Sequence, residues 1–170
     1  MGCLRGKQST QGSGYYVILR GPLGSGKSTV AESLASAVHG IVVHLDGLAD
    51  RKWDGGSARM YLNGNVALER KARPILARGI PVIFDGGFYW KSQIRDLEAR
   101  LPYPHQTFTL KVPLSVCIER DRQRSPTPSG PLQAGIVFRK VNRFERGIPI
   151  DGLRSVALQV KSIQARLSPE

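Results

Sequence analysis

The sequence predicts a single α/β domain with a five-stranded parallel sheet and helices on both faces. Three observations predict this class. Short apolar runs rich in β-branched residues alternate with segments whose apolar residues recur every three or four positions. A glycine-rich loop, GPLGSGKST at residues 21–29, joins the first such strand to the first helix. The chain has 170 residues, 41% of them hydrophobic, which suits one domain. We expect residues 14–170 to form it and residues 1–13 to be a polar, flexible tail.

The expected strands are short apolar segments, as in sheets that helices cover on both faces. They are residues 15–20, 40–47, 80–85, 105–112 and 147–151. The ends of parallel strands meet at one edge of the sheet, so residues that follow these strands are the first candidates for a ligand site.

The expected helices come from apolar residues spaced three or four apart. They are the segment carrying Val30, Leu34 and Val38, residues 66–78, 91–101, 115–124 and 132–146, and the segment carrying Val156, Val160, Ile163 and Leu167. Pro74 is expected to kink the helix at 66–78, and Gly79 to end it. The polar, glycine-bearing segment 48–65 is expected to be a loop with at most a short helix.

The loop at residues 21–29 fits the phosphate-binding pattern G-x-x-x-x-G-K-[ST] through Gly21, Gly26, Lys27 and Ser28. Glycines let successive N–H groups point at one anion, and the following helix adds its positive end. Lys27 would reach the β- and γ-phosphates of ATP, and the Ser28 hydroxyl would bind Mg²⁺. The expected nucleotide-binding residues of the loop are Gly21, Gly24, Ser25, Gly26, Lys27, Ser28 and Thr29. The alternative is a chance glycine turn before a helix.

Two aspartates end expected strands that should face this loop. Asp85 closes the apolar run PVIF, as a carboxylate that holds Mg²⁺ commonly does. Asp46 ends the preceding strand and is better placed to orient an acceptor hydroxyl and take its proton. The alternative for each is an aspartate that caps a turn or a helix.

Three arginines precede the loop SPTPSGP, at the end of one expected helix. Arg120 and Arg124 lie four apart and face the same way, whereas Arg122 lies on another side. A lid at about residues 120–131 would close over ATP, exclude water and neutralise the charge of the transferred group. We expect Arg120 and Arg124 to act in catalysis, and Arg120 and Arg122 to bind the nucleotide. The alternative is a solvated basic helix end.

The composition limits the partners and the location. The net charge is +12, and 17 of the 25 basic residues are arginine, which favours phosphate-bearing partners without naming one. No apolar run is long enough to cross a membrane, and no signal peptide is visible. Cys3 and Cys117 have no metal-type spacing, so a reduced, cytoplasmic setting is expected. The oligomeric state stays open.

Together, GPLGSGKST, Asp46, VIFDGG, VPLSVCIERDRQR and GIPIDG resemble the small P-loop kinases over about residues 15–167. The pattern is most similar to the group that holds bacteriophage polynucleotide kinase, chloramphenicol phosphotransferase and zeta-toxin-like enzymes; gluconate and shikimate kinases are more distant. The resemblance implies the strand order 2-3-1-4-5, ATP with Mg²⁺ as donor, Asp46 as base, and a lid arginine against adenine. It also implies an arginine just after the strand-two aspartate. Arg51 is the candidate for this position, although its spacing from Asp46 is loose.

Three functions stay open at this point. The first is a kinase for a hydroxyl of a small metabolite, which we favour slightly. The second is a kinase for nucleic-acid 5′-hydroxyl ends, favoured by the charge and by Arg139, Arg143 and Arg146, with Trp53 or Tyr61 as a stacking face. The third is a regulatory ATPase without an acceptor, although the guanine signature N-K-x-D and the transporter signature L-S-G-G-Q are both missing.

Overall fold

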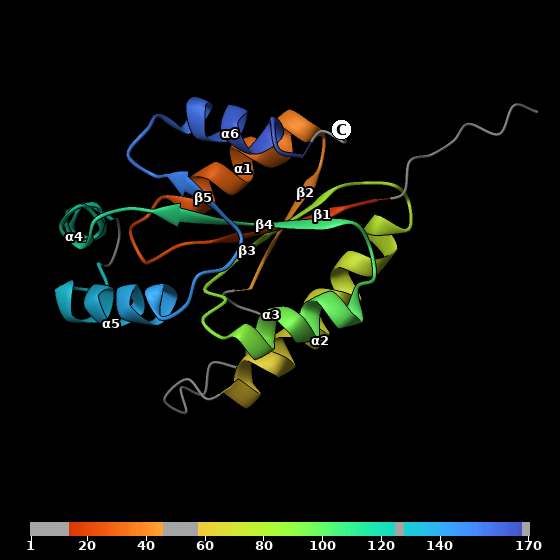
Figure 1. Ribbon diagram of the computed structural model, residues 1–170, viewed down its shortest axis with the longest axis horizontal. Coiled ribbons are helices and arrows are strands. Elements are labelled where there is room, and N and C mark those ends of the chain that lie inside the picture. The colour runs from red at the N-terminus through yellow and green to blue at the C-terminus, as the bar shows by residue number, and fades with distance from the viewer. Residues whose placement is uncertain (1–13, 46–57, 125–127, 168–170) are drawn as a thin grey trace, which may run out of the picture.

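Five parallel strands form one sheet in the order β2-β3-β1-β4-β5, which confirms the predicted fold (Figure 1). The computed structural model describes residues 14–45, 58–124 and 128–167. The strands are β1 (Tyr16–Arg20), β2 (Ile41–His44), β3 (Val82–Asp85), β4 (His105–Lys111) and β5 (Ile148–Asp151). The expected flexible tail at residues 1–13 lies outside the described residues.

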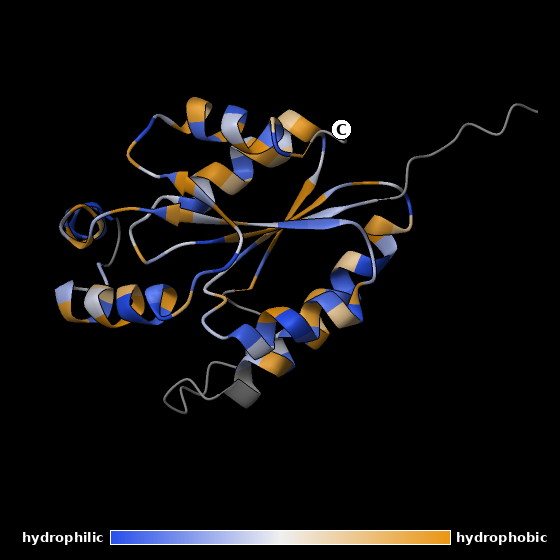
Figure 2. Ribbon diagram, viewed as in Figure 1, coloured by the Kyte–Doolittle hydropathy of each residue, from blue (hydrophilic) through white to orange (hydrophobic). Residues whose placement is uncertain are grey.

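Helices cover both faces of this sheet (Figure 1). They are α1 (Lys27–Val38), α2 (Ala58–Leu76), α3 (Lys91–Arg100), α4 (Leu114–Arg122), α5 (Pro131–Asn142) and α6 (Val156–Gln164). In β1, Tyr16 and Ile18 belong to the core shared with α2 and α3, while Val17 and Leu19 belong to the core shared with α1 and α6. Because successive side chains of a strand point to opposite faces, β1 is buried throughout. Figure 2 shows the apolar colour concentrated on the strands and on the helix sides toward them.

Helix α2 corrects the expectation of a loop up to residue 65. It begins at Ala58, since tertiary packing overrides the weak helix preference of Asn63, Gly64 and Asn65. Asn65 is fully buried and donates to the Gln93 carbonyl oxygen at 2.7 Å. A Cβ on Gly64 would come within 2.9 Å of Leu45 Cδ1, so a larger residue there would displace the Leu45 side chain just after β2.

The other helix ends differ from the predictions by a few residues. Helix α2 runs through Pro74 and ends at Leu76, and Gly79 then adopts a φ of 77°. Helix α5 ends at Asn142 rather than at residue 146, because the chain must turn at Gly147, whose φ is 74°, to enter β5. In the part of the chain that the structure describes, no helix is long and apolar enough to span a membrane.

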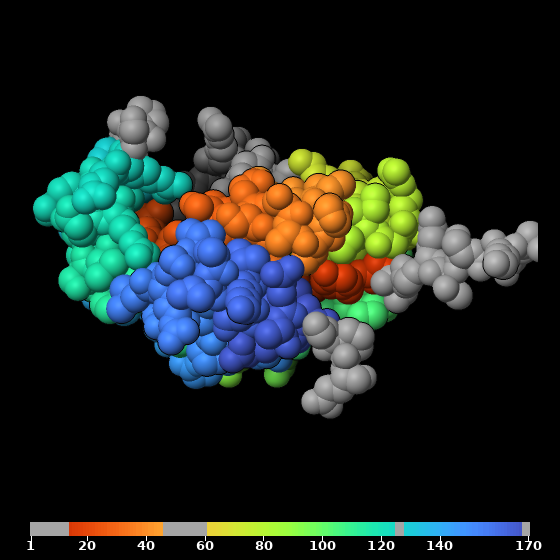
Figure 3. Space-filling view, turned by 90° about the horizontal axis from the view of Figure 1, so that it is seen from above, coloured from red at the N-terminus to blue at the C-terminus, as the bar shows by residue number. Residues whose placement is uncertain are grey.

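The strand register brings the ends of the central strands together. Asp85 is paired with Leu19 of β1 and with His44 of β2. Arg20, the last residue of β1, is paired with Thr109 of β4. Figure 3 shows α1 and α6 on one face of the molecule, with α4 beside them. The segment between β1 and α1 therefore lies at the edge where a parallel sheet binds ligands.

Candidate active site at the phosphate loop

The phosphate loop, residues 21–26, is shaped by glycines with left-handed backbone. Gly24 and Gly26 have φ values of 78° and 86°. A Cβ on Gly24 would lie 2.2 Å from the Cys117 carbonyl oxygen, so no larger residue fits between the loop and α4. Gly26 is the N-cap of α1, where no side chain caps the helix and the first turn has no acidic residue. The first N–H groups of α1 and its positive end are therefore available to an anion.

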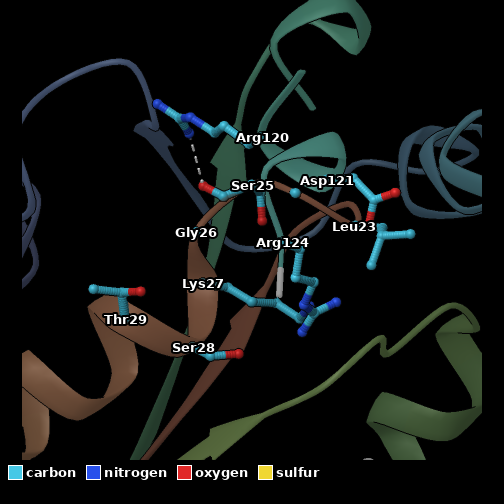
Figure 4. Close-up of a pocket in the computed structure, with 10 residues that line it drawn as sticks. Leu23, Ser25, Gly26, Lys27, Ser28, Thr29, Arg120, Asp121 and Arg124 are labelled. Carbon is cyan, nitrogen blue, oxygen red and sulfur yellow. Dashed lines mark hydrogen bonds between the residues drawn. The ribbon is translucent and has the colours of Figure 1, made fainter. Parts of the chain in front are cut away.

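A cavity of about 240 Å³ lies between this loop and the end of α4 (Figure 4). Its lining holds three cations and one acid. The lining residues are Leu23, Gly24, Ser25, Gly26, Lys27, Ser28, Thr29, Arg120, Asp121 and Arg124. Gly21 lies outside this lining, and a Cβ there would meet Ser25 Oγ at 2.6 Å; its contact with nucleotide stays a prediction. The cavity combines uncapped N–H groups with side-chain cations, as a polyphosphate site requires.

The arginines near the end of α4 divide into two groups. Arg120 donates to the Ser25 carbonyl oxygen at 3.2 Å and to the Gly152 carbonyl oxygen at 3.3 Å, and thus joins the phosphate loop to the loop after β5. Arg124 follows the helix and lines the same cavity. Arg122 does not line it; this exposed side chain forms an ion pair with Glu119 at 3.2 Å. The structure thus brings Arg120 and Arg124 to the loop, and a nucleotide contact by Arg122 stays a prediction.

Asp121 is a lining residue that the sequence reasoning missed. It is only 2% exposed, and its Oδ2 accepts the Gly130 N–H at 2.8 Å. Gly130 is the N-cap of α5, with a φ of 88°. Asp121 therefore fastens the end of α4 to the start of α5. The available signal was an acid between two arginines, Arg120 and Arg122, nine residues before a glycine that precedes a helix-starting proline.

Asp85 is held by a chain of polar side chains at the end of β3. It is 3% exposed, and its Oδ2 lies 3.0 Å from His44 Nδ1. The other ring nitrogen, Nε2, lies 3.2 Å from Glu32 Oε1 on α1. His44 and Glu32 were not expected from the sequence, since their contact depends on how α1 packs over β2. Asp85 does not line the phosphate cavity itself.

These groups fit a magnesium ion with few protein ligands. The second carboxylate oxygen of Asp85, Oδ1, is buried and has no hydrogen-bond partner among the residues that the structure describes. Ser28 offers a hydroxyl from the first turn of α1. Among the described residues, no group of three or more His, Cys, Asp or Glu side chains is assembled for a metal. Mg²⁺ commonly takes one or two protein oxygens and completes its shell with phosphates and water, so this donor set suits it.

The remaining predicted residues have different outcomes. Asp46, Arg51 and Trp53 lie outside the described residues, so Asp46 stays a predicted base. Tyr61 does not offer the suggested open stacking face: it is 7% exposed, and the edge-to-face contact of its ring with Tyr89 has centroids 5.6 Å apart. Its burial follows from the early start of α2.

Arg20 is a buried cation that periodicity could not reveal. It is 0% exposed and donates to the Phe88 carbonyl, the Thr109 hydroxyl and the Val141 carbonyl, at 3.3, 3.3 and 3.0 Å. Burial lowers the pKa of Arg20 to about 10, so the guanidinium stays charged at neutral pH. It therefore connects the strand that enters the phosphate loop to β4, α5 and the segment after β3.

Comparisons with known proteins agree with this fold. Residues 17–136 match a family model described as an AAA domain. A gluconokinase from Sinorhizobium meliloti 1021 superposes with a TM-score of 0.72 at 21% identity, over 89% of this chain and 92% of that one. No curated protein sequence matches significantly.

Two further solved structures have the same fold. The shikimate kinase of Aquifex aeolicus has a TM-score of 0.63 at 18% identity, with 89% of this chain and 95% of that chain covered. The APS kinase of Mycobacterium tuberculosis, in complex with AMPPNP and APS, has a TM-score of 0.65 at 18% identity, with 91% and 98% covered. At these identities the similarity establishes a P-loop kinase-like fold.

Proposed function

The chain belongs to the AAA domain family, and we infer that it is an ATP-dependent kinase that phosphorylates a hydroxyl group of a small metabolite. One observation carries this proposal. Lys27, Arg120 and Arg124 line the same cavity as the uncapped start of α1. Phosphoryl transfer needs cations around the transferred group more than it needs covalent chemistry by the protein.

Each residue has a defined part in the proposed reaction. The loop N–H groups and Lys27 bind the phosphates, while Arg120 and Arg124 neutralise charge on the transferred group. The acceptor oxygen bonds to the γ-phosphorus as the bond from that phosphorus to the β–γ bridging oxygen breaks, and ADP leaves. The hydroxyl proton passes to the Asp46 carboxylate. Ser28 and Asp85 would hold Mg²⁺, which when bound neutralises part of the phosphate charge.

A metabolite acceptor is supported by the kinds of protein that have this fold. The gluconokinase, shikimate kinase and APS kinase are named for small acceptors. The finer resemblance to the polynucleotide kinase and chloramphenicol phosphotransferase group is part of the proposal, as are the cytoplasmic location, the contact of Arg122 with nucleotide and the lid at residues 120–131. The two rivals are a nucleic-acid 5′-hydroxyl kinase, supported by the +12 charge, and a regulatory ATPase.

The proposal is tested by offering several acceptors at once. Labelled ATP and Mg²⁺ are incubated with the protein and, in parallel, with a pooled metabolite extract, 5′-hydroxyl DNA and 5′-hydroxyl RNA. We expect label in the metabolite pool and none with Lys27→Ala, because the β- and γ-phosphates lose their cation; Lys161→Ala, on α6, is the matched control. Label on an oligonucleotide end, in an amount that falls steeply as the salt concentration rises, would establish a nucleic-acid 5′-hydroxyl kinase instead. Turnover without any acceptor would favour the regulatory ATPase.

A further inference from the structure

A row of cations and aromatic rings lies where α5 meets the segment after β3. Three residues, Tyr89, Trp90 and Lys91, face Lys140, Arg143 and Phe144 of the α5 end; we call these six residues the cation–aromatic seam. Lys140 Nζ lies 5.9 Å from the centre of the Tyr89 ring, and Arg143 Cζ lies 5.2 Å from that of Trp90. Lys91 Nζ lies 5.7 Å from the centre of the Phe144 ring. Each contact pairs a cation from one side of the seam with a ring from the other.

The seam is fixed to the strand that enters the phosphate loop. Arg20 Cζ lies 4.4 Å from the centre of the Phe144 ring. The same guanidinium donates to the carbonyl oxygens of Phe88 and Val141, which flank the two sides of the seam. Arg20 is followed directly by Gly21, so the seam and the phosphate loop share one rigid support. In Figure 1, α5 and α3 lie on the same face of the sheet, on either side of the segment that leaves β3.

Lys91 and Arg143 of the seam carry positive charge that no described carboxylate neutralises. Both side chains are exposed, and neither forms an ion pair with the residues that the structure describes. Two nearby acids are paired elsewhere: Glu145 with Lys111 at 2.9 Å, and Asp96 with Arg100 at 2.7 Å. A ring attracts a cation but leaves its charge in place, so Lys91 and Arg143 keep their attraction for an anion.

Two further features of the seam suit an anion. Trp90 is the N-cap of α3, which no side chain caps and whose first turn has no acidic residue. The indole Nε1 of Trp90 is buried and has no hydrogen-bond partner in the described part of the chain. A buried donor without a partner costs free energy, and an acceptor atom supplied by a ligand would remove that cost.

We propose that the cation–aromatic seam binds an anionic group of the acceptor, a carboxylate or a phosphate or sulfate ester, so that the enzyme acts on hydroxyl compounds that carry a negative charge. This inference rests on the proposed kinase function and specifies its substrate class. Arg143 and Lys91 hold the anion, and Arg20 positions the seam relative to the phosphate loop. With a neutral acceptor, two exposed cations, the uncapped start of α3 and the Trp90 donor would have no anion to bind.

The test measures binding with the phosphate loop already occupied. The protein is saturated with AMP-PNP and Mg²⁺, so that anions cannot compete for the nucleotide site. Gluconate and glycerol 3-phosphate are then titrated by calorimetry, each beside its uncharged counterpart, sorbitol and glycerol. We expect millimolar binding of the anions and none of the neutral compounds. Arg143→Gln and Lys91→Gln should each weaken anion binding by about 10- to 100-fold, since each removes a charge-assisted contact.

Arg70→Gln and Lys161→Gln are the matched controls, because these exposed cations lie on α2 and α6 and make the same change of charge. They should bind the anions as the wild type does, and melting temperatures show that all four variants fold. Equal anion binding by wild type and Arg143→Gln, equal binding of charged and neutral probes, or no anion binding would each overturn the proposal.

Fractionation of the metabolite extract gives a second readout. The extract is separated on an anion exchanger before labelling, and each fraction is then offered to the protein with labelled ATP. Label should appear with the retained fraction, whose compounds are anionic before phosphorylation; label with the unretained fraction would contradict the seam's role. Failure of the kinase function looks different, because AMP-PNP would then not bind, or no compound would be labelled although the seam binds anions.

Discussion

At the residue scale, Asp46 is the proposed base, and an experiment can distinguish this role from a role in nucleotide binding. Asp46→Asn keeps the size of the side chain but removes the charge that accepts a proton. We expect unchanged affinity for ATP and a kcat lower by about 10²–10⁴-fold, the usual loss of general-base catalysis. Calorimetry with AMP-PNP and steady-state kinetics measure the two quantities. A variant that loses ATP affinity but transfers normally would assign Asp46 to the nucleotide or metal site.

Also at the residue scale, His44 is expected to orient Asp85 for Mg²⁺. Its Nδ1 lies 3.0 Å from Asp85 Oδ2, which leaves the unpartnered Oδ1 for the metal. Loss of a group that orients a metal ligand typically weakens metal affinity about 10- to 100-fold. We therefore expect His44→Ala to raise the Mg²⁺ concentration needed for half-maximal nucleotide binding by about that factor.

Asp85→Asn should raise this Mg²⁺ requirement at least as much, since it removes the ligand's charge. Nucleotide binding without Mg²⁺ should stay the same in both variants. The exposed His39 at the end of α1 offers a control, His39→Asn, which tolerates the positive φ of 52° there. An unchanged Mg²⁺ requirement in Asp85→Asn would exclude Asp85 from the metal site.

At the element scale, the Asp121–Gly130 hydrogen bond fixes the relation of α4 to α5. Asp121→Ala removes the carboxylate that accepts the Gly130 N–H, whereas Asp121→Asn keeps an acceptor oxygen there. A hydrogen bond to a charged group contributes about 1.5–3 kcal/mol. In the alanine variant the population in which α4 and α5 separate should therefore rise by about tenfold or more. We expect faster tryptic cleavage after Arg120, Arg122 and Arg124 in Asp121→Ala and near-normal cleavage in Asp121→Asn.

The same experiment tests the proposed lid. AMP-PNP should slow cleavage at these arginines in the wild type, because closure over a nucleotide protects them. Glu119→Ala, which removes the exposed ion pair with Arg122 and the hydrogen bond from Gln123, is the control for a change of charge on α4. Identical cleavage with and without AMP-PNP would indicate a static basic helix end.

At the scale of the whole molecule, Arg20 connects elements that are far apart in the sequence. Its guanidinium reaches Phe88, Thr109 and Val141 from the end of β1. Arg20→Met keeps much of the volume but leaves buried oxygens without their donor, at a cost of about 1–3 kcal/mol each, part of which is offset because no charge is buried. We expect a free energy of unfolding lower by about 2–4 kcal/mol.

Denaturant unfolding measures this loss. Arg95→Met, which changes an exposed arginine of α3, should leave stability within about 0.5 kcal/mol of the wild type. Stability of Arg20→Met equal to that of the wild type would show that the buried charge costs as much as its hydrogen bonds contribute.

The sequence by itself determined the order of strands and helices and the position of the phosphate loop. Both are written in local patterns: apolar runs such as residues 80–85, helical spacing such as Val30, Leu34 and Val38, and the pattern G-x-x-x-x-G-K-[ST]. Because side-chain period and backbone preference act over a few residues, they can be read without knowing the fold. The wrong loop assignment before residue 66 marks the limit of such patterns, since the burial of Asn65 and the fit of Gly64 against Leu45 depend on distant residues.

Only the tertiary structure decided which polar groups meet. Asp121 contacts the start of α5, His44 joins Asp85 to Glu32, and Arg20 lies beneath Phe144. None of these contacts has a fixed spacing in the chain, because each depends on how a helix is placed over the sheet. The cation–aromatic seam has the same origin: residues 89–91 and 140–144 are about fifty positions apart in the sequence, and packing of α5 against the segment after β3 brings them together.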